Sequence, residues 1–445
     1  MNNSNKLGLF DLTIIVISLV IGMGIFKTPA GIAAKSGTET IFYSAWVVGG
    51  IIALIGALVF AEIGARLPVV GAYYKVFSYA YHPSVGFTVN TLILISNAAS
   101  LAVVTLIGAE YCSDLLFGMQ KGYAFNVGLS VLAVSIFFVV NLLGLKTSSR
   151  TQNIMMIVKV GLVLMLISAL FAGKAIEPHG YTTDPVRTYD GTNGLLLLVV
   201  SMVAVSFTYG GYQQTINFGG EVNKKGALQK GIFIGIIIVV LLYLAVNYAY
   251  VQVIGFDKMK NATSIGALLF EAWFGKIGGK LFDFAMFLSV LAYVNILLMS
   301  NPRVMYAMSV DGVLPKIFSY QHPKTNALIP GLIAFSVITI SVTFFGKGVD
   351  NILGFSIFLD SMGFVTCALA LLILRKRKHN EELVQPGFIK SIIPALAIIF
   401  MLAYSVVASA VVIDNWLAAL TGVGLLLLFV AIYFIFMRKP QPPEF

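Results

Sequence analysis

Apolar stretches of about 20 residues recur along the whole chain, with short polar segments between them. A helix of that length crosses the hydrocarbon core of a bilayer, so each stretch predicts one membrane-spanning helix. The pattern predicts an all-α integral membrane protein with about twelve such helices and no large soluble domain. Their approximate bounds are 10–34, 41–66, 85–117, 124–145, 152–172, 194–220, 230–255, 280–309, 327–346, 351–374, 390–412 and 416–437.

Two of these stretches are interrupted near their middle. The first contains "LVIGMGIFKTPAGIAAKSG" at Leu19–Gly37, and the sixth contains "VSFTYGGYQQTINFGGE" at Val205–Glu221, where Gly210 and Gly211 fall near mid-span. An unpaired backbone group in lipid costs several kcal/mol, so a broken helix is stable only where it faces protein or a cavity. We therefore expect the first and sixth helices to be broken around a site inside the protein.

The spacing of the two interruptions predicts how the chain is organised. Two broken helices five spans apart are typical of a transporter that is built from inverted repeats. We expect residues 10–172 to form the first five-helix repeat and residues 173–378 the second. Two additional helices then lie in residues 379–437, and the terminal segments 1–9 and 438–445 lie outside the membrane.

A helix break suits a ligand that carries two opposite charges. The N–H groups and dipole at the start of the second half-helix attract a carboxylate. The freed carbonyl groups at the other break can accept hydrogen bonds from an ammonium group, and glycine lets a ligand approach the backbone closely. The two breaks together could bind both ends of an α-amino acid, whereas the alternative is that these glycines only allow close helix packing.

The net charge of +10 indicates membrane topology rather than nucleic-acid binding. The basic residues fall on one side of the membrane if the spans alternate, whereas acids offset the bases in the loops at 174–190 and 257–280. By the positive-inside rule, both termini are expected in the cytoplasm of a multi-pass protein of the cell membrane. The basic side includes Arg66, Lys75, Lys146, Arg150, Lys224, Lys225, Lys316, Lys324, the "RKRK" run at 375–378, Arg438 and Lys439.

The cysteine and histidine contents argue against a metal site, a cofactor or an enzyme. The two cysteines, Cys112 and Cys367, lie in apolar helical stretches, and the four histidines are scattered singly in loops or at helix ends. No spacing typical of a zinc site occurs, and no histidine is placed to activate a nucleophile.

Four segments resemble motifs of one transporter superfamily. They are "IGMGIFKTPAG", "VFAEIGARLPVVGAYYKV", "FTYGGYQQTINFGGEVNKKGALQKGI" and "NPRVMYAMSVDGVLPKIF", which occur in this order between Leu9 and Arg375. They are similar to the signatures of the amino acid–polyamine–organocation superfamily, with the L-type amino acid transporters and their bacterial relatives as the nearest branch. The resemblance implies a LeuT-like fold, with two inverted five-helix repeats plus two C-terminal helices, and secondary-active transport of amino acids.

The resemblance also implies a set of substrate-binding residues. Phe207 would cover the substrate as an aromatic gate, Tyr212 stands where relatives often have Trp, and Asn295 would line the pocket. Two departures are Met23, where Ser or Ala is common, and the absence of the usual Pro at Lys224. The substrate-binding residues implied are Ile21, Gly22, Met23, Gly24 and Ile25 for the carboxylate, Phe207, Thr208 and Gly210 for the ammonium group, and Tyr212 and Asn295 in the pocket.

Ionisable residues within membrane spans are costly and are functional by default. Lys159 matches a position where members of the family have a lysine and where some other transporters of this fold bind sodium. We therefore expect a coupling role for Lys159. The alternative is a lysine whose side chain snorkels to the membrane interface.

Lys27, Asp360 and Glu110 are expected to act in gating, with Lys27 and Asp360 as one pair. Glu110 is a competing partner for Lys27, and it could instead be solvated in the outer vestibule.

The sequence leaves several functions open. We favour sodium-independent transport of neutral amino acids, by exchange or with protons. A transporter of cationic amino acids or polyamines, with Glu110 or Asp360 binding the distal charge, is the main alternative. A sodium-coupled symporter, a channel and a membrane enzyme have less support. In the eukaryotic L-type transporters that the chain resembles, a cysteine between the third and fourth helices forms a disulfide with a heavy chain. The corresponding loop "FGMQKGYAF" has no cysteine, and Cys112 lies too deep in the third helix to replace it. No disulfide-linked heavy chain is therefore expected.

Overall fold

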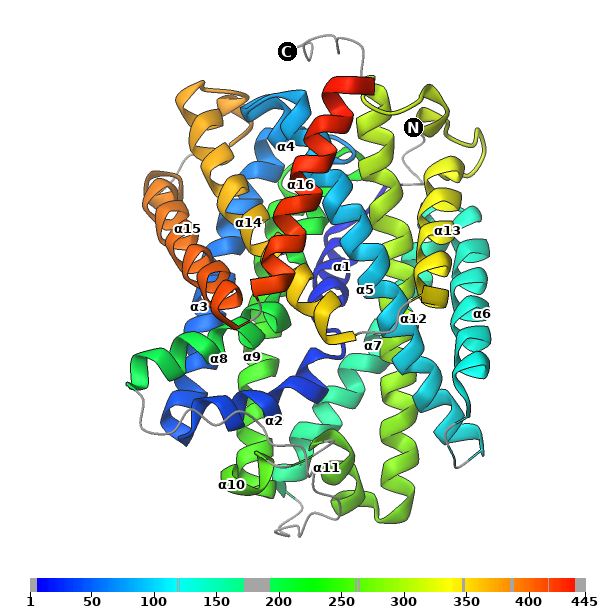
Figure 1. The fold of residues 1–445 in the computed structure, drawn as a ribbon, viewed down its shortest axis with the longest axis vertical. Helices are drawn as coiled ribbons and strands as arrows, with labels where there is room; N and C mark the ends of the chain where they lie inside the picture. The colour runs from blue at the N-terminus through cyan, green and yellow to red at the C-terminus, as the bar shows by residue number, and fades with distance from the viewer. Residues whose placement is uncertain are drawn as a thin grey trace.

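The computed structural model of the chain describes residues 6–117, 119, 121–171, 193–260, 262, 265–345, 349–384, 388–414 and 416–436. Within these residues no strand forms, and most of the long helices run roughly along the longest axis of the molecule (Figure 1). The expectation of an all-α membrane protein is confirmed. The long helices are α1 (Leu9–Val20), α2 (Gly24–Ser36), α3 (Glu39–Arg66), α5 (Pro83–Phe117), α6 (Tyr123–Leu142), α7 (Leu145–Ser168), α8 (Gly194–Tyr209), α9 (Ala227–Ile254), α12 (Lys276–Val310), α13 (Ile329–Phe345), α14 (Val349–Lys376), α15 (Phe388–Asp414) and α16 (Trp416–Phe436).

The lengths and surfaces of these helices suit a bilayer. Among the described residues, nine helices are long and apolar enough to cross a membrane, and three shorter apolar helices accompany them. Large aliphatic side chains are exposed on the outside of the bundle, including Leu132, Leu402 and Leu427. Exposed leucines in such number are stable against lipid tails but not against water.

Each predicted broken helix is interrupted in the structure. The first span consists of α1 and α2, with Ile21, Gly22 and Met23 between them. In the sixth span, α8 ends at Tyr209, and after two glycines the chain continues as the 3₁₀ segments η3 (Tyr212–Asn217) and η4 (Gly219–Glu221).

The segments between the spans contain short helices that the hydrophobic pattern does not predict. These are α4 (Ala72–Ala80), α10 (Phe256–Met259) and α11 (Ile265–Phe274). They are too short to cross a bilayer, so they give no span signal. In Figure 1, α4 lies at one end of the bundle, which we call the α4 end, and α2, α10 and α11 lie toward the other.

Two hydrophobic clusters divide most of the interior. One is centred on α1, α3 and α9, and the other on α5 and α12. Met23, in the break of the first span, packs against both clusters. The broken region therefore lies where the two packed halves of the molecule meet.

Candidate functional site

A cavity of about 330 Å³ lies at the two helix breaks. Residues of both breaks line it, together with side chains from α5, α12, α14 and α15. Along α5 the lining runs from Ser96 to Ile107, about three helical turns, so the cavity extends along the bundle. From the breaks it is lined by Leu19, Val20, Gly22, Met23, Gly24 and Thr28, and by Ser206, Phe207, Thr208, Gly210, Gly211, Gln213 and Gln214.

The two breaks lie directly against each other. Gly211 has a φ of +110°, and a Cβ atom there would lie 2.2 Å from the carbonyl oxygen of Leu19, so only glycine fits. The hydroxyl oxygens of Thr28 and Thr208 are 3.0 Å apart and join the first turns of α2 to the last turn of α8. The glycine at position 211 is therefore required by the close approach of the two broken helices.

Tyr243 on α9 bridges the breaks from behind. Its hydroxyl lies 3.0 Å from the carbonyl oxygen of Val20 and 3.2 Å from that of Thr208, and its side chain is fully buried. The single O–H is shared between these two carbonyl oxygens, and the Val20 oxygen also accepts the N–H of Gly22 at 2.8 Å. The sequence pattern does not single out Tyr243, because α9 also contains Asn247, Tyr248 and Tyr250 within the next two turns.

Lys159 on α7 reaches the same region. Its side chain is completely buried, and its ammonium group donates a hydrogen bond to the carbonyl oxygen of Ile21, inside the first break. Because no exposed part remains, Lys159 does not snorkel to the membrane surface. The contact supports a role at the break, and the nature of that role remains a prediction.

The predicted substrate residues fall into two groups. Gly22, Met23 and Gly24 line the cavity from the first break, and Phe207, Thr208 and Gly210 line it from the sixth span. Ile21 and Ile25 are fully buried beside the cavity and are not among its lining residues.

Two predicted pocket residues lie outside the cavity lining. Tyr212 is fully buried behind the sixth-span break, and its ring stacks on that of Phe364 with centroids 6.1 Å apart. Asn295 is fully buried among α6, α7 and α12, where its amide contacts Asn141 at 2.9 Å and Gln152 at 2.7 Å. Asn295 therefore joins three helices instead of facing the cavity, a placement that sequence periodicity does not distinguish from a lining one.

The predicted gating residues are also placed differently from one another. Asp360 on α14 lines the cavity, whereas Glu110 on α5 lies beyond Ile107 and is not part of the lining. The backbone of Lys27 belongs to α2, but its side chain lies outside the described part of the chain. The expected pair of Lys27 and Asp360 therefore remains a prediction.

Ion pairs at the α4 end join the two halves of the molecule. Arg303 on α12 contacts both carboxylate oxygens of Glu221, at 2.6 and 3.1 Å, and both side chains are buried. Lys75 on α4 pairs with Asp311 at the end of α12. The backbone of Leu7 also exchanges hydrogen bonds with Glu221 and Asn223, of 2.8 and 3.0 Å, which ties the start of α1 to the segment after η4. These contacts join α12 to η4 and to α4, and the start of α1 to the segment after η4.

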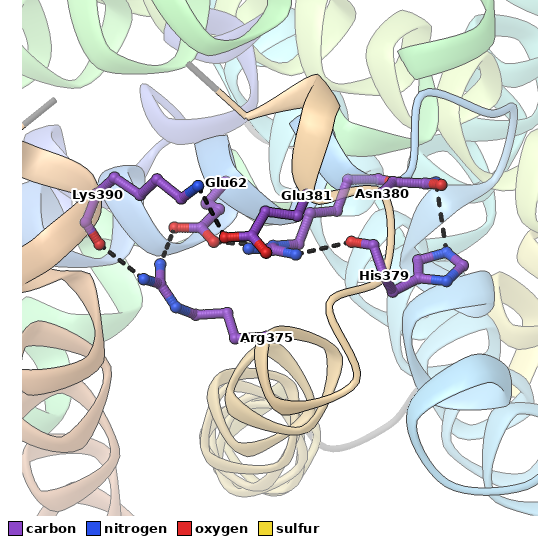
Figure 2. A network of polar contacts seen from close by, with 7 residues as sticks. Glu62, Arg375, His379, Asn380, Glu381 and Lys390 are labelled. Atoms are coloured by element: carbon purple, nitrogen blue, oxygen red, sulfur yellow. Dashed lines mark hydrogen bonds and ion pairs between the residues drawn. The ribbon is translucent and has the colours of Figure 1, made fainter. Parts of the chain in front are cut away.

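A second network at this end links α3 to the connection between α14 and α15 (Figure 2). Glu62 lies 2.8 Å from Arg66 and 2.6 Å from Arg375, and Arg66 donates to the carbonyl oxygen of His379. Burial and the Arg66 guanidinium hold the pKa of His379 below its usual range. Lys390 on α15 completes the network through Glu381.

The chemistry of the cavity is that of a binding site. No three His, Cys, Asp or Glu side chains converge as a metal site in the residues that the structure describes. Membrane-spanning helices that break around a central cavity are typical of secondary transporters.

Comparison with known proteins identifies the family. Residues 7–439 match the amino acid permease family model, so the chain belongs to the amino acid permease family. It is a multi-pass membrane transporter of amino acids and not an enzyme.

Individual relatives cover most of the chain. The serine/threonine exchanger SteT of Bacillus subtilis is 28% identical over 401 residues, which cover 88% of both proteins. The branched-chain amino acid permease BcaP of the same organism is 26% identical over 98% of this chain and 93% of its own length. The human large neutral amino acids transporter small subunit 2 is 24% identical, covering 99% of this chain and 82% of its own.

Proposed function

We propose that the protein transports neutral L-amino acids across the cell membrane by sodium-independent alternating access, through exchange or with protons. The observation that carries this proposal is the cavity at which two broken helices present backbone groups to one ligand. The N–H groups at the start of α2 suit the substrate carboxylate, because the helix dipole is positive there. The carbonyls at the end of α8 keep a second lone pair for the substrate ammonium group.

The neutral substrate and the independence from sodium rest on different observations. The relatives are named for serine and threonine, for branched-chain amino acids and for large neutral amino acids, which all have uncharged side chains. Lys159 donates its hydrogen bond to the break of the first span, where a coupling sodium ion would otherwise bind among carbonyl oxygens. A lysine there supplies a positive group without a metal ion.

The arrangement in the membrane follows from the charge pattern. We place both termini and the α4 end in the cytoplasm, since Lys75 lies on α4 and Arg377, in the basic run at 375–378, donates to the carbonyl oxygen of Tyr79 on α4 at 2.7 Å. Residues 10–172 and 173–378 form the two inverted repeats, and the cavity then opens toward the outside. Both cysteines are buried, so we expect the protein to act without a disulfide-linked heavy chain.

A carrier of cationic amino acids or polyamines is the second candidate, because Asp360 lines the cavity. Glu110 does not line it and supports this candidate less. Lysine, ornithine and putrescine distinguish the two candidates, since each carries a distal ammonium group that a neutral amino acid lacks.

Uptake and counterflow in proteoliposomes test the proposal. Purified protein is reconstituted with an amino acid inside, and entry of labelled serine, threonine, leucine, lysine and putrescine is followed with sodium or choline outside. We expect entry of neutral amino acids at equal rates in both media. A requirement for sodium, or entry of lysine and putrescine alone, would contradict the proposal.

A further inference from the structure

The link between α12 and α13 exposes two large apolar side chains. It contains the 3₁₀ helix η5 (Lys316–Ser319), in which Ile317 is 64% exposed, and Tyr320, the residue directly after η5, is 48% exposed. A 3₁₀ helix has three residues per turn, so positions 317 and 320 lie on the same face. The link begins at the α4 end of the bundle, because Asp311, which follows α12, pairs with Lys75 on α4.

Contacts within the link hold this face outward. The hydroxyl of Ser309 donates to the carbonyl oxygen of Pro315 at 2.8 Å, just before η5. The N–H of Tyr320 donates to the carbonyl oxygen of Ile317 at 3.1 Å. Phe318, between these two residues, instead packs against the hydrophobic cluster of α5 and α12. The turn therefore buries one large apolar side chain and presents its two neighbours to the surroundings.

The exposed face continues the apolar outer surface of the neighbouring helices. η5 packs against both α12 and α13. Val310, the last residue of α12, and Ile333, near the start of α13, are exposed on either side of the link. Leu143, between α6 and α7, is exposed as well, and the next residue, Gly144, lies closely against the carbonyl oxygen of Thr325 in the link. The lipid that covers the outer surface of these helices is thus adjacent to η5.

The charges of the link complement an anionic surface. Lys316 and Lys324 are exposed, and neither forms an ion pair within the part of the chain that the structure describes. Residues 312–328 contain no Asp or Glu, and Asp311 before them is paired with Lys75. A lysine near an anionic leaflet strengthens the attraction to it by about fivefold. Tyrosine is also enriched at the level of the lipid headgroups.

We propose that η5 anchors the protein in the headgroup layer of an anionic leaflet at the α4 end. The side chains of Ile317 and Tyr320 insert into this layer. Lys316 and Lys324 contact the phosphate groups of the lipids around it. Apolar burial and electrostatic attraction together hold such a segment at a membrane surface. The inference goes beyond the proposed function, because it concerns the bilayer and requires no change in the rate of transport.

The depth of a fluorescent probe tests the proposal. Both native cysteines are buried, so Ile317→Cys in the full-length protein can be labelled selectively with a nitrobenzoxadiazole dye. The labelled protein is placed in nanodiscs of phosphatidylcholine, with or without phosphatidylglycerol, that contain a lipid spin-labelled on its acyl chain. With phosphatidylglycerol present, we expect emission shifted to shorter wavelength and quenching by the spin label. Without it, the ratio of inserted to solvent-exposed probe should fall by about fivefold for each lysine.

Matched labels calibrate this measurement. Leu427→Cys, on the exposed surface of α16, should be quenched in both lipids. Lys225→Cys, at an exposed position of the link between η4 and α9, should remain unquenched in both. Tyr320→Cys labels the second position of the proposed face and should report the same depth as Ile317→Cys.

Neutralising the lysines separates the two parts of the anchor. Lys316→Gln combined with Lys324→Gln, in the labelled Ile317→Cys protein, should reduce quenching in phosphatidylglycerol nanodiscs to the level in phosphatidylcholine. Equal quenching in both lipids, with or without the lysines, would overturn the assignment to an anionic leaflet.

Probes at positions 317 and 320 that behave like the probe at position 225 would overturn the anchor itself, and would leave this face to a soluble protein partner. Neither result bears on the proposed function, because the depth of the probe is measured without substrate.

Discussion

The charged residues at the α4 end and those around the cavity are satisfied in opposite ways. At the α4 end, Arg303 is paired with Glu221, and Glu62 contacts two guanidinium groups. Near the breaks, the buried Lys159 donates to a backbone carbonyl, and Asp360, which lines the cavity, has no ion-pair partner in the described residues. A charge paired with an opposite charge stabilises the packing of the segments that it joins, whereas a charge without such a partner can interact with a bound ligand. The comparison indicates that the ion pairs at the α4 end stabilise the fold, whereas the region of the breaks is arranged for ligand binding.

Removing one member of a buried ion pair at the α4 end should lower the stability of the protein more than any other change considered below. Glu221→Gln leaves Arg303 buried against a neutral partner, and removal of one member of a buried pair costs about 3–5 kcal/mol. We expect a marked fall in melting temperature in detergent and loss of transport.

The matched control is Asp257→Asn, which removes the exposed pair with Lys260, where Asp257 is 91% exposed. Exposed pairs contribute little, so its melting temperature should match that of the wild type. Equal melting temperatures for both variants would show that the Arg303–Glu221 pair does not stabilise the folded protein.

Lys159→Met tests whether the hydrogen bond from Lys159 to the first break is needed for transport. Methionine preserves much of the volume but removes the hydrogen bond to Ile21, and such bonds from charged groups contribute about 1.5–3 kcal/mol. We expect transport to slow by roughly tenfold to a hundredfold. Lys316→Ala, at an exposed position of η5, should transport normally, and wild-type rates in Lys159→Met would contradict a role for this amine.

Asn295→Ala distinguishes a residue that joins helices from one that contacts substrate. The change removes the donor to the Oε1 atom of Gln152 and one of the two acceptors of the Asn141 amide, at a cost of about 1–3 kcal/mol. Because Asn295 lies outside the cavity lining, we expect a lower melting temperature and a lower Vmax with an unchanged KM for the amino acid. A raised KM with a normal melting temperature would instead show that Asn295 contacts the substrate.

The smallest expected effect is a pH dependence of stability that arises from His379, in the network shown in Figure 2. The folded protein disfavours protonated His379, because burial and Arg66 lower its pKa. The unfolded chain therefore takes up a proton first as the pH falls below about 6.5, and stability decreases until the folded pKa is passed. Melting temperatures of the wild type and His379→Gln, compared between pH 7.5 and 5.5, should show a smaller decrease in the variant. An equal decrease would exclude His379 as the source.

The sequence predicts the spans and the breaks because both are local signals. Twenty apolar residues in a row, or Gly210 and Gly211 within such a row, are visible without any tertiary contact. The short helices between spans are missed, since α4 depends on contacts such as those of Gly71, where an added Cβ would lie 2.4 Å from the carbonyl oxygen of Arg303.

The site is only partly predictable for a similar reason. The glycines in the sequence identify the residues whose backbone forms the breaks. Three of these glycines, Gly22, Gly24 and Gly210, line the cavity. Tyr243 and Asn295 depend on which face of a buried helix meets which neighbour. An apolar helix that is buried on several sides has little amphipathic periodicity to reveal that orientation.

Competition by amino acids with blocked ends tests the central claim most directly. The claim is that the two helix breaks recognise the carboxylate and the ammonium group of one substrate. In a counterflow assay with a labelled neutral amino acid, the unlabelled parent should compete, while its N-acetyl and carboxamide derivatives should fail to compete at concentrations about a hundredfold higher. Competition by either blocked derivative at the concentration of the parent would contradict the claim.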